Sequence, residues 1–289
     1  MTNRETDEAT GVETTGHEWD GIKELDNPMP RWWLWTFYAC IVWALGYAIA
    51  YPSLPFVSGA PKGVLGYSSR ANLHADIADA NAEQADLLQK IETLPLAAIR
   101  NDANTFQFAV SGGRAAFAVN CSQCHGSGAQ GSPGYPNLND DVWLWGGSLD
   151  EIHTTLKHGI RFQQDDDTRF SLMPAFGTDG LLSRPQIIDT SHFVRKLGGL
   201  EHDTEAAERG APLYEENCAV CHKSNGVGDR EQGAPSLMDA ISHYGDGLNA
   251  IAAQISRPRH GVMPGWKDRL DPATLKQLAI YVHSLGGGE

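Results

Sequence analysis

Two short stretches with the same spacing decide how this chain folds: CSQCH at 121–125 and CAVCH at 218–222. Both have the C-x-x-C-H pattern, which is typical of covalent haem c attachment. Two thiols three residues apart on a turn that leads into a helix can reach the two vinyl groups of one porphyrin, and the histidine that follows can bind the iron. The motifs therefore predict two haem c groups, held by Cys121, Cys124 and His125 and by Cys218, Cys221 and His222.

Other uses of these four cysteines fit the pattern less well. A zinc ribbon separates its two C-x-x-C pairs by about 15 to 20 residues, whereas 93 residues lie between Cys124 and Cys218. A thioredoxin-like redox pair needs a βαβ context. Neither that pair nor a structural disulfide accounts for a histidine after both second cysteines. Cys40, the fifth cysteine, has no matched partner.

The sequence around the motifs is an internal repeat. Gly113 lies eight residues before Cys121, and Gly210 lies eight residues before Cys218. The other matched positions are Phe117 with Tyr214, Asn120 with Asn217, 136–138 with 235–237, His158 with His260, Met173 with Met263, and 193–199 with 281–287. The copies differ mainly between the matched histidine and methionine, where the first copy has a longer, aspartate-rich segment. This repetition predicts a mainly α fold with two tandem class I cytochrome c domains, at 105–200 and 201–289.

The expected second axial ligands are Met173 and Met263, each followed by proline at equivalent places in the repeat. A thioether ligand favours ferrous iron and raises the reduction potential. The matched histidines His158 and His260 are the alternative ligands. We interpret the unmatched histidines as structural or solvated; they include His153, His192, His202, His243 and His283. With both axial positions filled, an iron can only transfer electrons, and the chain has no motif for group-transfer catalysis.

A single membrane-spanning helix is predicted at residues 32–51, which contain no charged residue. Twenty helical residues are about 30 Å long, the thickness of a hydrocarbon core. Aromatic residues expected at the two membrane interfaces are Trp32, Trp33 and Trp35 at one end and Tyr47 and Tyr51 at the other. A cleaved signal peptide is the alternative, since Ala48-Ile49-Ala50 resembles a cleavage site, but the preceding leader is long and acidic rather than short and basic.

The segments on either side of this helix carry no predicted active site. Residues 1–31 are rich in acids and lack an apolar period, which predicts a polar, largely unstructured tail. Residues 52–104 are expected to form a linker. Within it, apolar residues recur with a helical period between Ala71 and Leu94. This helix is expected to pack against the first cytochrome domain, or alternatively to act as a spacer that lifts the domain off the membrane.

Charge restricts the partners. With 22 basic and 36 acidic residues the formal net charge is −14, which argues against nucleic acid as a partner. Because haem c is attached outside the cytoplasm, the part after residue 51 is expected in the bacterial periplasm and the tail in the cytoplasm. An acidic periplasmic surface would attract a basic soluble electron donor.

The whole chain resembles a known family. The run GHEWDGIKELDNPMPRWWLW at 16–35, one span that ends in Tyr51-Pro52, and two haem c units are similar to the CcoP/FixP family, the dihaem subunits of cbb3-type cytochrome c oxidases. No span precedes the one described, as in the single-span members. The resemblance implies that the four cysteines hold the haems, that the two motif histidines are proximal ligands, and that Met173 and Met263 are distal ligands. In this family the two methionines can be exchanged between domains, which sequence alone does not decide.

The same resemblance implies a role. Such subunits are not catalytic themselves; they accept electrons from a periplasmic cytochrome c or the bc complex. They pass them through a monohaem subunit toward the haem–copper catalytic subunit, where oxygen is reduced and protons are translocated. The sequence leaves two alternative functions open: a dihaem cytochrome that serves another enzyme, such as a nitrogen-oxide reductase, and a haem-based sensor.

Overall fold

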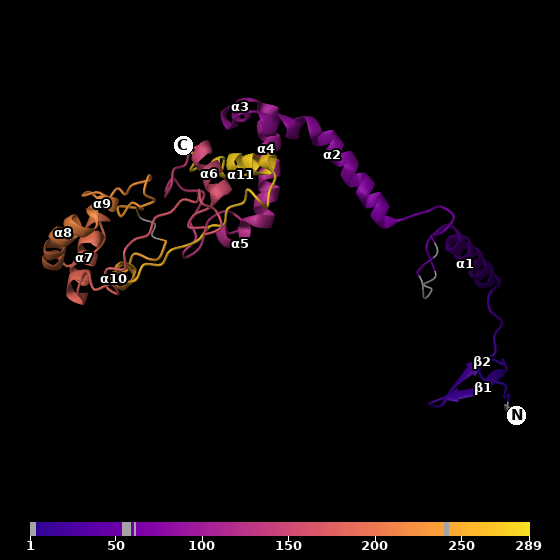
Figure 1. The fold of residues 1–289 in the computed structure, drawn as a ribbon. Coiled ribbons are helices and arrows are strands. Elements are labelled where there is room, and N and C mark those ends of the chain that lie inside the picture. Colours follow the sequence, from indigo (N-terminus) through magenta and orange to yellow (C-terminus); the bar gives the residue numbers. More distant parts are fainter. Residues whose placement is uncertain (1–3, 54–58, 61, 240–242) are drawn as a thin grey trace. The chain divides into compact units, whose positions relative to one another are not determined.

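The computed structural model describes residues 4–53, 59–60, 62–239 and 243–289, and the chain divides into two compact units, 1–83 and 84–289. The described residues are mostly helical, as the sequence predicts (Figure 1). The first unit contains β1 (Thr14–Trp19), β2 (Ile22–Leu25), α1 (Arg31–Ala50) and most of α2 (Ser69–Thr93). The second contains the end of α2 and α3 (Leu96–Asn101), α4 (Ala103–Asn120), α5 (Ser122–His125), α6 (Leu149–His158), α7 (Arg184–Leu197), α8 (Thr204–Asn217), α9 (Ala219–His222), α10 (Leu248–Ser256) and α11 (Pro272–His283).

The N-terminal tail is not unstructured, which corrects the expectation from its composition. Strands β1 and β2 pair as an antiparallel hairpin in which Trp19 lies opposite Ile22. The two connecting residues, Asp20 and Gly21, both have positive φ, at 48° and 83°. A two-residue loop with positive φ at both positions matches the right-handed twist of the paired strands, and Asp-Gly is a preferred sequence for it. The Asp20-Gly21 dipeptide indicates a hairpin, although the acidic composition of the segment suggested disorder.

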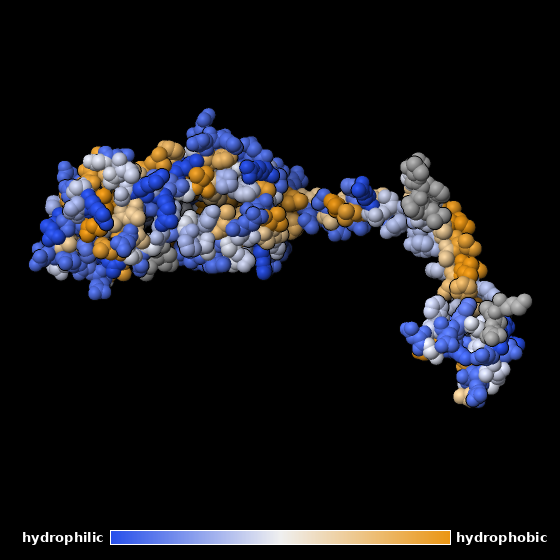
Figure 2. Space-filling view, turned by 90° about the horizontal axis from the view of Figure 1, so that it is seen from below, coloured by the Kyte–Doolittle hydropathy of each residue, from blue (hydrophilic) through white to orange (hydrophobic). Residues whose placement is uncertain are grey.

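Helix α1 has the length and composition of a membrane-spanning helix. It is one residue displaced from the predicted span, and it is the one helix among the described residues that is long and apolar enough to cross a bilayer. None of its residues is buried, and Trp43, for example, is 76% exposed. Figure 2 shows α1 as a continuous hydrophobic surface. The helix ends at Ala50, two residues before Pro52, whose missing N–H cannot continue it.

The amphipathic helix of the linker is α2, and its two ends differ. At its C-terminal end Ile91 is completely buried, and Leu88 and Leu94 pack against the same core. Near its N-terminal end Leu73 and Ile77 are about half exposed. Packing on the cytochrome part therefore accounts for the last turns of α2 and not for the first.

The helices of the second unit form two groups, which we call the first and second lobes. The first lobe consists of α3, α4, α5, α6 and α11, with the end of α2; the second consists of α7, α8, α9 and α10. In Figure 1, α11 at the C-terminal end of the colour scale lies beside α4 and α6, and α7 lies beside α8. The predicted boundary at 200/201 divides the sequence repeat but not the packing, because the last helix of each copy packs on the first helix of the other.

Glycines permit these close helix contacts. A Cβ at Gly113 in α4 would lie 2.2 Å from the backbone oxygen of Gln277 in α11. A Cβ at Gly210 in α8 would lie 2.1 Å from the backbone oxygen of Asp189 in α7. An aromatic pair accompanies each contact, Phe117 with Tyr281 and Phe193 with Tyr214. Glycine and aromatic residues at matched positions thus build the same helix pair twice.

Two segments connect the lobes and run past each other. Ile160 and Met263 form an antiparallel bridge, with hydrogen bonds of 2.9 and 3.0 Å. The Arg161 guanidinium donates to the backbone oxygen of Gly261 at 2.7 Å. Residues after α6 thereby enter the second lobe while residues after α10 return to the first.

Candidate haem-binding sites

Each C-x-x-C-H motif lies at the junction of a long helix and a single helical turn. Cys121 ends α4 and begins α5, and Cys218 ends α8 and begins α9. All four motif cysteines have free thiols. Burial raises the pKa of both Cys121 and Cys218 to about 11, so these sulfurs are uncharged at neutral pH.

The motif histidines are held in the same orientation in both copies. The Nδ1 of His125 lies 3.0 Å from the backbone oxygen of Pro136, and the Nδ1 of His222 lies 2.9 Å from that of Pro235. Because a carbonyl only accepts, Nδ1 is the donor and Nε2 keeps its lone pair for a metal. Burial lowers the pKa of both rings, which favours this neutral form. The sequence repeat matches Pro136 with Pro235, but it does not indicate that their carbonyls accept hydrogen bonds from the motif histidines.

Met263 lies in the first lobe, although it belongs to the second sequence copy. It packs against the buried cluster that contains Cys121, Phe117 and Leu156. The backbone N–H of Trp266, three residues later, donates to Leu156 in α6 at 2.9 Å and fixes this segment on the first lobe.

Met173 lies in the second lobe. It packs against the buried cluster formed by Phe176, Leu182, Ile187 and Ile255, together with Leu213 of α8. The backbone N–H groups of Gly177 and Thr178 both donate to the oxygen of Ser256 in α10 at 3.1 Å. The two methionines are therefore exchanged between the lobes relative to their order in the sequence.

The alternative ligands His158 and His260 make other contacts. His158 Nδ1 lies 3.0 Å from Asp165 Oδ2, and the same carboxylate binds Lys267 at 2.9 Å. His260 Nε2 accepts a hydrogen bond of 3.0 Å from the backbone N–H of Met173. One ring nitrogen of each histidine is thus already used within the protein.

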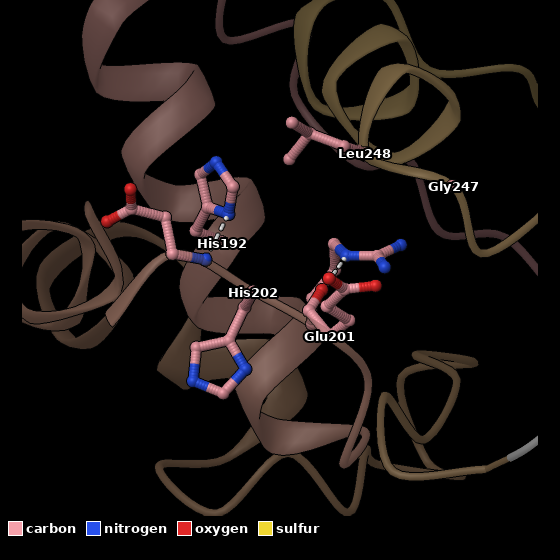
Figure 3. Close-up of a pocket in the computed structure, with 7 residues that line it drawn as sticks. His192, Glu201, His202, Gly247 and Leu248 are labelled. Carbon is pink, nitrogen blue, oxygen red and sulfur yellow. Dashed lines mark hydrogen bonds between the residues drawn. The ribbon is translucent and has the colours of Figure 1, made fainter. Parts of the chain in front are cut away.

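The unmatched histidines His192 and His202 line a shallow surface pocket of the second lobe (Figure 3). His192 accepts a hydrogen bond from the backbone N–H of Asp203 at 3.1 Å. The Nδ1 of His202 lies 2.8 Å from the backbone oxygen of Leu200. Both rings therefore fix the loop between α7 and α8, as expected for structural residues.

The donor set fits haem c in each lobe. Each motif offers two neighbouring free thiols and a neutral imidazole with a free Nε2, and a methionine packs in the same lobe. The chemistry of these groups matches covalent attachment through two cysteines and axial ligation by histidine and methionine.

Comparisons with known proteins agree with two cytochrome c domains that follow an N-terminal membrane segment. The N-terminal domain of cytochrome oxidase-cbb3, FixP, matches residues 11–58, cytochrome c matches 110–198, and subunit III of cbb3-type cytochrome c oxidase matches 205–282. The chain is 51% identical to the cbb3-type cytochrome c oxidase subunit FixP of Sinorhizobium medicae, over 99% of both chains. It is 52% identical to subunit FixPc of Rhizobium leguminosarum bv. viciae, over 100% of both.

A third relative bears the other family name. The chain is 50% identical to subunit CcoP of Cereibacter sphaeroides, over 96% of this chain and 95% of the relative. The cytochrome c domains imply covalently bound haem c. The chain therefore belongs to the FixP/CcoP family, the cytochrome c subunits that transfer electrons in cbb3-type cytochrome c oxidases.

Proposed function

We propose that this chain carries two haem c groups with exchanged methionine ligands. Cys121, Cys124 and His125 hold the first together with Met263. Cys218, Cys221 and His222 hold the second together with Met173. The packing of Met263 in the cluster that contains Cys121 supports this assignment most strongly.

The protein residues set what each site can do. A haem c with both axial positions filled supplies reversible one-electron transfer and offers no vacancy for oxygen. The Pro136 and Pro235 carbonyls hold the imidazoles neutral and fix their orientation. The buried apolar clusters exclude water, and this exclusion, like the thioether ligands, favours the ferrous state. The chain is then an electron carrier that is not catalytic by itself.

We place α1 in the bacterial inner membrane as a single anchor, with the hairpin in the cytoplasm and both lobes in the periplasm. Support comes from the exposed apolar surface of α1 and from the need to attach haem c outside the cytoplasm. The proposed neighbours are the haem–copper catalytic subunit, the monohaem cytochrome c subunit, and a donor cytochrome c or bc complex. The net charge of −14 favours a donor with a basic docking face.

Replacing one methionine in a chain with one haem tests the assignment. In a chain whose second motif is inactivated by Cys218→Ser and Cys221→Ser, Met263→His should lower the midpoint potential of the remaining haem, because imidazole stabilises ferrous iron less than a thioether. Met173→His in the same background should leave that potential unchanged. Inactivating Cys121 and Cys124 instead should reverse the two results.

Two measurements would contradict the proposal. A pyridine haemochrome count other than two haems c per wild-type chain would reject the cofactor assignment. A shift caused by Met173→His, and not by Met263→His, in the first background would show that each methionine serves the haem of its own sequence copy.

A further inference from the structure

The C-terminal end of α1 has partners within the chain for carbonyl groups that a helix usually leaves to water. The last four carbonyls of an α-helix lack an intrahelical partner, so they bind water or a capping group. In α1 the Tyr47 oxygen accepts from the backbone N–H of Tyr51 at 2.9 Å. The Ala48 oxygen accepts from the Ser53 hydroxyl at 3.0 Å.

The remaining two carbonyls are bound by residues 62–67, which we call the capping turn. The backbone N–H of Val64 donates to the oxygen of Ile49 at 2.9 Å, and that of Leu65 donates to the oxygen of Ala50 at 3.1 Å. The last carbonyl groups of α1 are therefore all satisfied without water. A helix end of this kind can leave water at no cost in lost backbone hydrogen bonds.

Gly63 permits the capping turn to approach the helix end this closely. Its φ is 70°, and a Cβ at this position would lie 2.4 Å from the backbone oxygen of Ala50. Gly66 has a similar φ of 61°, but a Cβ there would meet nothing within 4 Å. Both glycines therefore relieve backbone strain, and only Gly63 is also needed for the contact with α1.

The side chains of the capping turn do not pack into a core. A capping segment at a helix C-terminus commonly makes a hydrophobic contact with the last turn of the helix. Here Val64 is 80% exposed and Leu65 is 64% exposed. The helix that they cap has no buried residue either. The capping turn thus adds two apolar side chains to the exposed apolar surface of α1.

Three tyrosine rings lie together beside the capping turn. The rings of Tyr47 and Tyr51 are stacked with centroids 4.8 Å apart, and the ring of Tyr67 meets that of Tyr51 edge-on at 5.5 Å. A tyrosine has an apolar ring and a polar hydroxyl, so it favours the boundary between acyl chains and headgroups. The cluster therefore marks the level of a membrane interface at this end of α1.

The opposite end of α1 is built differently. Its N-cap residue, Pro30, makes no side-chain hydrogen bond to the first turn, and the charged Arg31 is the first helical residue. Free N–H groups and a charge both favour contact with water or headgroups. Only the C-terminal end combines satisfied backbone groups with exposed apolar side chains, the combination that a region without water requires.

We propose that the capping turn inserts into the phospholipid bilayer, with Val64 and Leu65 among the acyl chains and Tyr67 at the headgroups. The inference rests on the proposed placement of α1 in the membrane. The apolar surface of the turn continues that of a single span, which lipid surrounds, and this continuity favours lipid over a protein partner as the group that covers it. The anchor then consists of α1 and the capping turn together, and α2, which begins at Ser69, starts at the bilayer surface.

Fluorescent labels at single cysteines test the depth of the capping turn. The full chain with its haems is reconstituted in phosphatidylcholine vesicles in a Cys40→Ser background, and each new cysteine is labelled with nitrobenzoxadiazole. Val64→Cys and Leu65→Cys report on the turn, Val42→Cys in α1 is the membrane reference, and Ala82→Cys, at an exposed position in α2, is the aqueous reference. Nitroxide-labelled phospholipid should quench the labels at 64 and 65 as strongly as the label at 42. Iodide on both sides of the membrane should quench only the label at 82.

A pair of glycine variants tests whether the capping contacts hold the turn in the bilayer. Gly63→Ala should move the turn away from Ala50, so the label at 64 should lose its quenching by lipid and become sensitive to iodide. Gly66→Ala is the matched control, because it introduces the same backbone strain without a contact to α1, and it should leave both measurements unchanged. Equal quenching in the two variants would overturn the role of the capping contacts.

Failure of this inference and failure of the proposed anchor give different results. A label at 42 that lipid does not quench would contradict the placement of α1 in the membrane. Labels at 64 and 65 that behave like the label at 82, while lipid quenches the label at 42, would overturn this inference alone. In the assembled oxidase, protection of 64 and 65 from both quenchers would show that another subunit covers the turn, which would overturn the assignment to lipid.

Discussion

The two lobes derive from one repeated unit, yet they differ in how much protein surrounds each motif. The buried cluster of the first lobe draws on the end of α2 and on α3, α4, α6 and α11. That of the second lobe is small, with Phe176, Leu182, Ile187 and Ile255 as its buried members. Since small domains bury little apolar surface, the second lobe should depend more on its haem for stability. The difference shows that equal motifs do not imply equal cores.

What the lobes share is the glycine contact between the first helix of one sequence copy and the last helix of the other, and breaking it should have the largest effect. Gly113→Ala places a methyl group 2.2 Å from the Gln277 backbone oxygen and should cost about 3 kcal/mol of unfolding free energy. Gly210→Ala should cost a similar amount through the backbone of Asp189. Urea denaturation followed by the absorbance of each haem would report the loss by lobe.

A matched control exists beside the first glycine. A Cβ on Gly112 would meet only the terminal amide of the Gln277 side chain, whereas one on Gly113 would meet the Gln277 backbone. Alanine also favours a helix over glycine by about 1 kcal/mol. Gly112→Ala should therefore be nearly neutral, and equal losses at 112 and 113 would contradict the role assigned to the close helix contact.

The pairing of these helices is the part of the fold that could not be predicted from the sequence. The motifs, the repeat and the matched methionines could all be read from spacing. The exchange of the last helices and the methionines between the lobes could not be read from spacing. Phe193 and Tyr281 are equivalent residues in the repeat, and either could pack beside Gly113. The short connection of α7 to α8 brings those two helices together, and α4 then pairs with α11.

The longer segment of the first copy supplies a buried ion pair at Asp165, and its removal should have an intermediate effect. The Asp165 side chain is 3% exposed and binds both Lys267 and His158. The hydrogen bond from Lys267 keeps the pKa of Asp165 below its ordinary value. Asp165→Asn should therefore lower the thermal midpoint of the first lobe at neutral pH, since it leaves Lys267 without its anion.

The pH dependence of that effect follows from the direction of the pKa shift. A carboxyl whose pKa is lower in the folded state stabilises the fold above its unfolded pKa of about 4, and this contribution disappears as the pH falls through the folded pKa. The gap between wild type and Asp165→Asn should therefore narrow below about pH 4. Asp166→Asn, at an exposed neighbour, should show no gap at any pH. A gap that is constant from pH 3 to 7 would show that the carboxylate charge is not the cause.

The smallest expected effect concerns the residue that follows each motif histidine. It has positive φ in both lobes, 82° at Gly126 and 61° at Lys223. A non-glycine residue in this region costs about 1–2 kcal/mol, so the second lobe carries backbone strain that the first avoids. Lys223→Ala keeps the strain and loses the Lys223–Asp229 ion pair, which is an exposed pair at 2.6 Å. Lys223→Gly loses the same pair but removes the strain, and so it should be about 1 kcal/mol more stable than Lys223→Ala by urea denaturation. If the two variants unfold at the same urea concentration, the backbone at residue 223 is not strained, and the positive φ of Lys223 does not destabilise the second lobe.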